Sequence, residues 1–520
     1  MSQEKKIINA FRWQSLNVIV QSVIQLVFNA LLARLISKES FGIMAIVLII
    51  TGFIDIFAQI GIGPAIIQKK EISKSEISGS FYLSAILGIL FFGFLWISAP
   101  YIAAYYHDSG LCPLLRIIGI SFIISAISII PKSLLLKKLM FKQLFISVTI
   151  GMFVGLMLVG LTLAYLKFEV WAYALALLSQ SLIMTICYWY FHPLKLEPLS
   201  SIKKAKSLIR YGGGSTLFTF FNYLSSKIDV FLVSRYASTD SAAGNNWGET
   251  GVYDQSLKVM SYPITIIGKL SDSVMFSGLS MIQDQTTKLK FAYRSAFSVL
   301  ASISLPLSIF LVIFSEEVVL ILLGDKYLGA IPVVQMLFIA LFMRTIIKLS
   351  DAVVRALDRV YTGAFIKFIY FSAIGLFVWI ALSDIPFVKS LNLGLTGVAI
   401  ALILAVFVQF ILMTMLTLSI LKIRLKEIIK LAIGPLIVAA VTLVLCLFTK
   451  MGLNTFGFPV LVNIIVGGLS LGLSYIIILW FVPKSFGSGE HNMLNVLLRK
   501  LPSRGFIKTL QQRVEQKTNK

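Results

Sequence analysis

Four charged residues lie at helical spacing inside a long apolar stretch of the chain. They are Arg344, Lys348, Asp351 and Arg355, in steps of four, three and four residues, so one face of a single helix carries them all. A charge that faces lipid costs about 2.5–3.5 kcal/mol. We therefore expect this row to face protein or a water-filled cavity. Because its net charge is positive, such a cavity would suit an anionic ligand such as a phosphate or an acidic sugar.

Polar side chains recur at helical spacing in other apolar stretches. The residues that we expect to line a cavity are Arg344, Lys348, Asp351, Lys258, Asp254, Lys227, Asn222, Gln21 and Gln25. Two further carboxylates, Asp229 and Asp55, could bind a proton or a sodium ion. The alternative for all of these groups is that they form ion pairs and helix–helix hydrogen bonds that only hold the bundle together.

Helices that cross a membrane must position these side chains. The chain has 520 residues, of which 58% are hydrophobic and 13% charged, whereas soluble proteins carry about 25% charged residues. Its apolar residues come in blocks of about 20 to 25, enough to cross the ~30 Å hydrocarbon core of a bilayer as a helix. The sequence therefore predicts an all-α polytopic membrane protein with about 14 transmembrane helices.

The distribution of positive charge predicts the orientation. The formal net charge is +23 at pH 7, and most Lys and Arg residues lie in alternate short connections between the apolar blocks. Such connections stay in the cytoplasm, so we expect both termini there. The same distribution argues against a nucleic-acid partner. We expect the basic tail, residues 483–520, to lie on the anionic inner surface of the membrane.

The two halves of the sequence look related. PLLRIIGISFIISAISIIPKSLLLKKLM, from Pro113, aligns without a gap with PVVQMLFIALFMRTIIKLSDAVVRALDR, from Pro332. ALLARLIS, from Ala30, likewise matches FLVSRYAS, from Phe231. Polar residues at equivalent positions of two halves are typical of secondary transporters, in which two lobes meet around a cavity. Chance similarity among apolar helices is the alternative.

From this repeat we expect two six-helix lobes followed by two extra helices. The predicted parts are an N-terminal lobe (1–191), a cytoplasmic interlobe linker (192–210), the core of a C-terminal lobe (211–383), the last span of that lobe (384–420), two extra spans (421–482) and the cytoplasmic tail (483–520).

Motifs of enzymes and of metal or cofactor sites are missing from the sequence. There is no G-x-x-x-x-G-K-[ST] phosphate loop and no H-E-x-x-H, and the three cysteines are widely scattered. Gly468–Gly472 matches the Gly-x-Ser-x-Gly string, but it lies inside an apolar span and lacks the strand–turn–helix setting of a nucleophile elbow. We therefore predict no catalytic residues, no metal ligands and no cofactor.

Several blocks of sequence resemble a known family. They are LLARLISKESFGIMAIVLIITGFIDIFAQIGIGPAIIQKK (31–70), TGVYDQSLKVMSYPITIIGKLSDSVMFSGLSMIQD (250–284) and LILLGDKYLGAIPVVQML (320–337). In order and spacing they resemble the polysaccharide transport family of the multidrug/oligosaccharidyl-lipid/polysaccharide exporter superfamily. That family includes O-antigen flippases and exporters of the colanic-acid type.

The resemblance implies a flippase of the bacterial plasma membrane. It would move an undecaprenyl-diphosphate-linked sugar unit outward by alternating access, for lipopolysaccharide, capsule or exopolysaccharide synthesis. The implied partners are this lipid-linked glycan, membrane lipids, an H+ or Na+ counter-ion, and glycan polymerase or assembly proteins. The alternatives are a multidrug/cation antiporter of the same superfamily and an integral-membrane glycan polymerase. An antiporter would have a net acidic cavity, and a polymerase a large outer loop with catalytic Arg or His; the sequence favours neither.

Overall fold

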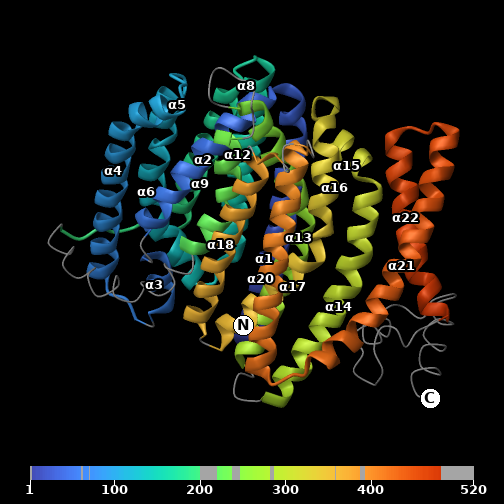
Figure 1. Ribbon diagram of the computed structural model, residues 1–520. Coiled ribbons are helices and arrows are strands. Elements are labelled where there is room, and N and C mark those ends of the chain that lie inside the picture. Colours follow the sequence, from blue (N-terminus) through green and yellow to red (C-terminus); the bar gives the residue numbers. More distant parts are fainter. Residues whose placement is uncertain are drawn as a thin grey trace. The chain divides into compact units, whose positions relative to one another are not determined.

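The structure is a computed structural model, and every regular element in its described part is a helix (Figure 1). This confirms the predicted all-α class. The described residues are 3–59, 62–69, 71–198, 220–236, 246–281, 286–357, 359–383, 385–386, 390 and 393–481. The predicted tail and most of the predicted interlobe linker lie outside them. The chain divides into two compact units, one of Met1–Gln255 with Lys367–Val398 and one of Ser256–Ile366 with Ala399–Lys520.

Unit 1 contains the first half of the helices. They are α1 (Gln3–Leu35), α2 (Lys38–Gln59), α3 (Ile62–Gln68), α4 (Lys74–Tyr105), α5 (Leu111–Ile118), α6 (Ile120–Lys137), α7 (Phe141–Met152), the π-helix η1 (Phe153–Gly160), α8 (Leu161–Tyr165), α9 (Val170–Phe191) and α12 (Ile228–Tyr236). Three helices cross the division between the units: α13 (Trp247–Met281), α18 (Val360–Leu382) and α20 (Gly394–Leu421).

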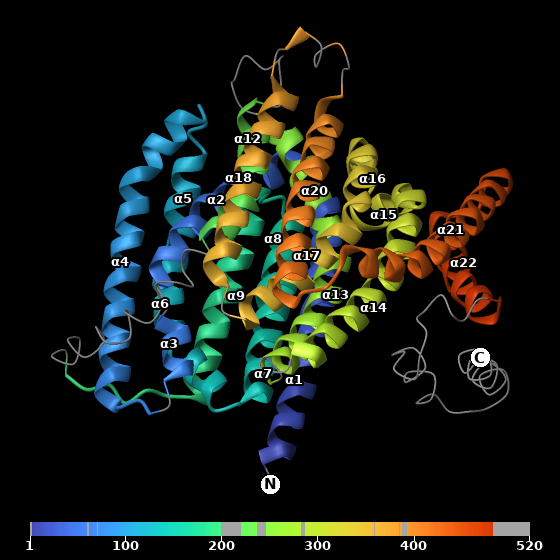
Figure 2. The same ribbon diagram turned by 60° about the horizontal axis from the view of Figure 1, so that its bottom comes forward.

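Unit 2 is built around the long helix α14 (Thr286–Ile313). Its other helices are α15 (Ser315–Leu322), the 3-10 helix η3 (Asp325–Ala330), α16 (Ile331–Ile339), α17 (Leu341–Ala356), α21 (Leu425–Phe456) and α22 (Val460–Phe481). The helices α21 and α22 lie side by side (Figure 2), and α14 packs along α21. In the hydrophobic core of unit 2, Tyr293 and Phe297 of α14 lie in one cluster with Leu349 and Val353 of α17.

Eleven helices in the described part are long and apolar enough to cross a membrane, and a bent pair would make a twelfth. The chain is therefore a multi-pass membrane protein. The predicted count of 14 remains a prediction, because part of the expected seventh span, residues 212–235, lies outside the described residues.

The expected seventh span is not one continuous helix. A turn at Ser226–Lys227 precedes α12. The hydroxyls of Ser225 and Ser226 donate to the backbone carbonyls of Asn222 and Tyr223. Such bonds offer the backbone an alternative to the helical ladder.

The expected tenth span, residues 331–354, is not straight: Asp325–Ile339 and Leu341–Ala356 meet at a bend of 46°. The hydroxyl of Ser308 in α14 donates to the carbonyl of Phe338, at 2.5 Å. A side chain that takes up a carbonyl of the helical ladder is a known cause of kinks. The bend separates α16 from α17, the helix that carries the charged row.

The aligned segments of the two halves have similar burial patterns. Ile130 and Leu134 of α6 are buried in unit 1, and the aligned Leu349 and Val353 of α17 are buried in unit 2. Between them, the aligned Lys132 and Asp351 are less buried than their neighbours. The predicted repeat requires this agreement, since equivalent helices should bury equivalent faces.

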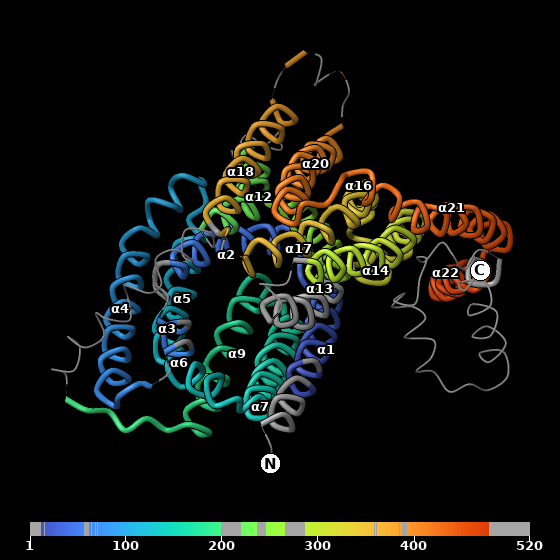
Figure 3. The backbone as a smooth tube through the Cα atoms, turned by 90° about the horizontal axis from the view of Figure 1, so that it is seen from below, coloured from blue at the N-terminus to red at the C-terminus, as the bar shows by residue number. Residues whose placement is uncertain are grey.

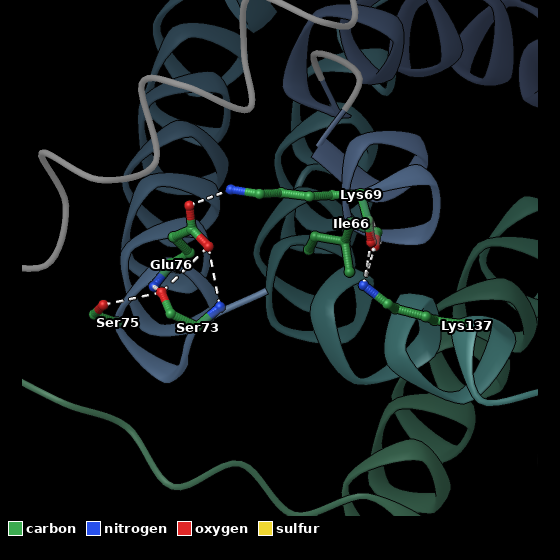
Figure 4. Close-up of polar contacts among 6 residues, drawn as sticks. All are labelled: Ile66, Lys69, Ser73, Ser75, Glu76 and Lys137. Carbon is green, nitrogen blue, oxygen red and sulfur yellow. Dashed lines mark hydrogen bonds and ion pairs between the residues drawn. The ribbon is translucent and has the colours of Figure 1, made fainter. Parts of the chain in front are cut away.

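Two close contacts fix helices within unit 1. A Cβ atom on Gly251 would lie 2.0 Å from the carbonyl oxygen of Lys38, so α13 and α2 touch through their backbones there. At the other contact, Lys137 of α6 donates to the carbonyls of Ile66 and Lys69, which end α3 (Figure 4). Lys69 also pairs with Glu76 at the start of α4.

Candidate functional site

A cavity of about 370 Å³ lies inside unit 1. Its walls come from α1, α6, α7, η1 and α9. Figure 3 shows α1, α7 and α9 in one group, with α7 in contact with both of the others. This volume is within the ~300–1,000 Å³ range of small-molecule sites.

One wall of the cavity is a row of amide side chains on α1. Gln14, Asn17, Gln21 and Gln25 follow at steps of three, four and four residues, so they share one helix face. The Nε2 of Gln21 donates to Oδ1 of Asn17 at 2.7 Å, which fixes the orientation of both groups. Gln21 and Gln25, two of the residues predicted from the sequence, thus lie in one cavity.

The opposite wall is α9, which contributes Tyr173, Gln180 and Tyr188. Behind Gln180, α9 is pressed against the π-helix η1: a Cβ on Gly155 would lie 2.3 Å from the backbone nitrogen of Gln180. Short π-helical insertions are often found at functional sites. Here the insertion lets Leu156 reach the cavity while its glycine packs on α9.

The two ends of the cavity differ. At the end where α1 begins, Lys132 of α6 is the one charged residue of the lining. At the other end, Nδ2 of Asn29 donates to Oε1 of Gln255 in α13 at 3.0 Å, and both residues are buried. Apart from Lys132 the lining is neutral, with polar side chains on α1 and α9 and apolar side chains between them on α7 and η1.

The charged row of α17 lies in unit 2 and has the predicted arrangement on one face. Arg344, Lys348 and Asp351 are half-buried and Arg355 is exposed, whereas Thr345–Ile347, Leu349–Ser350 and Ala352–Val354 are all buried. The buried face contributes Ile346, Leu349 and Val353 to the core around α14. The charged face is thus the less buried side of this amphipathic helix.

Arg344 and Lys348 of this row differ in their hydrogen bonds. Lys348 Nζ donates to the backbone carbonyl of Ile264 in α13 at 3.4 Å. The Nε of Arg344 is buried and has no hydrogen-bond partner within the part of the chain that the structure describes. A buried donor without a partner is costly, so a ligand oxygen there would be favoured. The row keeps a net positive charge, since it holds three cations and one carboxylate.

The other predicted residues are distributed over both units. Asp229 of α12 is buried and accepts a hydrogen bond from the hydroxyl of Tyr253 at 3.0 Å. Asp254 of α13 is buried, Lys258 of the same helix is half-buried, and both have further interactions. Of the remaining three, Asp55 and Lys227 are half-buried and Asn222 is exposed. None of these six residues lines the cavity of unit 1.

The predicted site residues do not include several polar residues of this cavity, among them Lys132, Tyr173, Gln180 and Tyr188. The three on α9 share one face at steps of seven and eight residues, so they lie two helical turns apart and do not form a continuous polar row. The alignment of the two halves could have indicated Lys132, because it is equivalent to Asp351 of the charged row.

The fold and these polar sites define a polytopic helical membrane protein with polar side chains inside its helical units. Two solved structures share the fold. One is titled "Lipid II flippase MurJ, inward closed conformation", with a TM-score of 0.68 and 13% identity, covering 89% of this chain and 98% of that one. The other is an inward-facing multidrug resistance MATE family transporter of the MOP superfamily, with a TM-score of 0.59 and 17% identity, covering 77% and 95%.

The profile of a family described as "Polysaccharide biosynthesis protein" matches residues 31–332, more than half of the chain. The chain belongs to this family, as its resemblance predicted. It is 26% identical to the lipopolysaccharide biosynthesis protein WzxC of Escherichia coli (strain K12), over 66% of this chain and 69% of the relative. It is 25% identical to the teichuronic acid biosynthesis protein TuaB of Bacillus subtilis (strain 168), over 68% and 72%.

Proposed function

We propose that the chain is a flippase that moves an undecaprenyl-diphosphate-linked oligosaccharide or polysaccharide repeat unit outward across the bacterial plasma membrane. Membership of the polysaccharide biosynthesis family supports a role in glycan assembly, and the fold it has in common with a lipid II flippase supports movement of a lipid-linked cargo. The observation that carries the proposal is the half-buried, net positive face of α17.

The cargo explains why cations should lie on a membrane-spanning helix. A diphosphate linker is an anion with several acceptor oxygens, and a guanidinium presents several donors to such a group. In the proposed mechanism Arg344 and Lys348 hold the diphosphate, Asp351 limits the local repulsion between them, and the lipid tail stays in the bilayer. Net positive charge at this face also disfavours a cation antiporter.

Movement by alternating access would be driven in one of two ways. An anion that leaves a negative interior gains about 2.3 kcal/mol per charge per 100 mV, so the membrane potential alone would set the direction. A proton or sodium ion could instead couple through Asp229 or Asp55. Asp229 is the better placed of the two, since it is buried and bonded to Tyr253. In this proposal both termini are cytoplasmic.

The test in cells is the double substitution Arg344→Gln/Lys348→Gln. We expect surface glycan to fall at least about tenfold, because two charge-assisted bonds of roughly 1.5–3 kcal/mol each are lost. Lipid-linked glycan should accumulate inside the cell while the protein remains in the membrane, as measured by glycan staining and by blotting of membranes.

The matched control is Lys288→Gln/Arg359→Gln, which removes two exposed cations from the same unit. This control should display glycan normally. Normal display in the Arg344/Lys348 double variant would refute the role given to the row.

A further inference from the structure

We propose that the amide-lined cavity of unit 1 is a binding site for the sugar part of the cargo, for an oligosaccharide that is neutral or carries one acidic group. This site is distinct from the charged row, which lies in unit 2. The inference rests on the proposed function, because it names what part of the lipid-linked glycan this cavity takes.

The chemistry of the lining matches sugar hydroxyls. Each amide offers two N–H donors and a carbonyl acceptor, and each sugar hydroxyl both donates and accepts. Gln14, Asn17, Gln21 and Gln25 on one wall face Gln180 on another. A lipid tail would leave these groups without hydrogen bonds, at a cost for each buried group. A diphosphate would find only the cation of Lys132.

The shape of the cavity fits an extended chain of sugars. The lining of α1 runs from Gln14 to Asn29, which is about 22 Å along the axis at 1.5 Å per residue. The lining of α9 runs over the same length in the opposite direction, from Tyr173 to Tyr188. Hydrogen-bonding side chains are therefore spread along the length of the cavity and do not converge on a single point.

A buried hydroxyl inside the cavity lacks a partner within the described residues. Tyr188 is 2% exposed, and its Oη has no hydrogen-bond partner in the described chain. A buried unsatisfied polar group usually has a functional explanation or an unobserved partner. A sugar hydroxyl at this end of the groove would satisfy it.

The charge of the lining sets the class of sugar. Lys132 is the one cation among the lining residues, and no carboxylate faces it there. One carboxylate of a uronic acid would therefore be accommodated beside Lys132, whereas several clustered charges would not. The remaining length of the groove is neutral and suits unmodified sugars.

The test measures binding of two water-soluble probes by the full-length protein in lipid nanodiscs. One probe is the oligosaccharide released by mild acid from the cell's own lipid-linked glycan, and the other is inorganic pyrophosphate. Saturation-transfer NMR gives the dissociation constant of the oligosaccharide, and isothermal titration calorimetry gives that of pyrophosphate. We expect Gln21→Leu/Gln180→Leu to weaken oligosaccharide binding at least about tenfold, as loss of two or more hydrogen bonds predicts, and to leave pyrophosphate binding unchanged.

Two further variants separate loss of binding from loss of folding. Gln25 is exposed, so Gln25→Leu should fold like the wild type and still weaken oligosaccharide binding several-fold. Gln143→Leu makes the same change in α7 outside the cavity and should bind both probes normally. Oligosaccharide binding unchanged in both cavity variants would overturn the inference, as would absence of binding by the wild type.

Failure of this sugar site and failure of the proposed flippase function give different results. Arg344→Gln/Lys348→Gln should give the converse pattern, with pyrophosphate binding weakened and oligosaccharide binding kept. A wild-type protein that binds the oligosaccharide but does not flip the lipid-linked glycan would refute the proposed function and leave this site in place.

Discussion

At the scale of residues, polar side chains of this chain gather on single faces of apolar helices. Arg344, Lys348 and Asp351 lie on the less buried side of α17, and Gln21 and Gln25 lie in one cavity of unit 1. Helical spacing predicts such rows where polar residues follow at every turn, but not where they lie two turns apart, as Tyr173, Gln180 and Tyr188 do on α9. Their roles in binding remain predictions.

The contact of His192 with Lys138 depends on the protonation of the imidazole ring. His192 follows the last residue of α9, and its Nε2 lies 2.8 Å from the ammonium of Lys138. Burial, and then the charge of Lys138, lower the pKa of His192 from its ordinary value of 6.5. The neutral imidazole accepts the hydrogen bond, whereas a protonated ring would face a second cation.

We therefore predict a pH-dependent contact after α9. Since the folded pKa is lowered, the contribution of this contact to stability is present above pH 6.5 and is lost as the pH falls through the folded pKa. An NMR titration of the histidine ring should show protonation below pH 6.5, and Lys138→Met should move the midpoint upward. A midpoint at or above 6.5 in the wild type would contradict the assignment.

At the scale of elements, hydropathy predicted most spans but not the interruptions within them. Serine hydroxyls bind backbone carbonyls at the turn at Ser226–Lys227 and at the bend between α16 and α17. A hydropathy value averaged over a whole span does not reflect such single contacts. The π-helix η1 packs against α9, and this tertiary contact is not contained in any local sequence pattern.

The contact of α2 with α13 gives a prediction for one glycine. A Cβ on Gly251 would overlap the carbonyl of Lys38 at 2.0 Å, and neither backbone can yield locally. Overpacking of this kind typically costs about 1–3 kcal/mol. We expect Gly251→Ala to lower the melting temperature of the purified protein by several degrees, as measured by differential scanning fluorimetry.

Gly375 of α18 provides the matched control. Nothing lies within 4 Å of a Cβ added there, so Gly375→Ala should leave the melting temperature unchanged or raise it slightly through helix propensity. Equal melting temperatures for Gly251→Ala and Gly375→Ala would show that the α2–α13 contact is not tight.

At the scale of the whole molecule, the sequence predicted the family and the all-α membrane fold, because order and spacing of apolar blocks are global features. The predicted repeat aligns Ile130 with Leu349, and both are buried; it also aligns Lys132 with Asp351. The division into lobes at 192–210 remains a prediction, since most of that segment is outside the described residues.

The central claim is that this chain flips an anionic, lipid-linked glycan with the help of Arg344 and Lys348. The most direct measurement uses purified protein in liposomes that contain a fluorescent undecaprenyl-diphosphate-linked oligosaccharide, with its exposure on each leaflet followed by a membrane-impermeant quencher. We predict flipping at least about tenfold faster than in protein-free liposomes, accelerated by a potential that draws anions across. With equal amounts of protein in the liposomes, Arg344→Gln/Lys348→Gln should flip the glycan no faster than protein-free liposomes do. Wild-type flipping no faster than that of empty liposomes, or full activity of the double variant, would contradict the account.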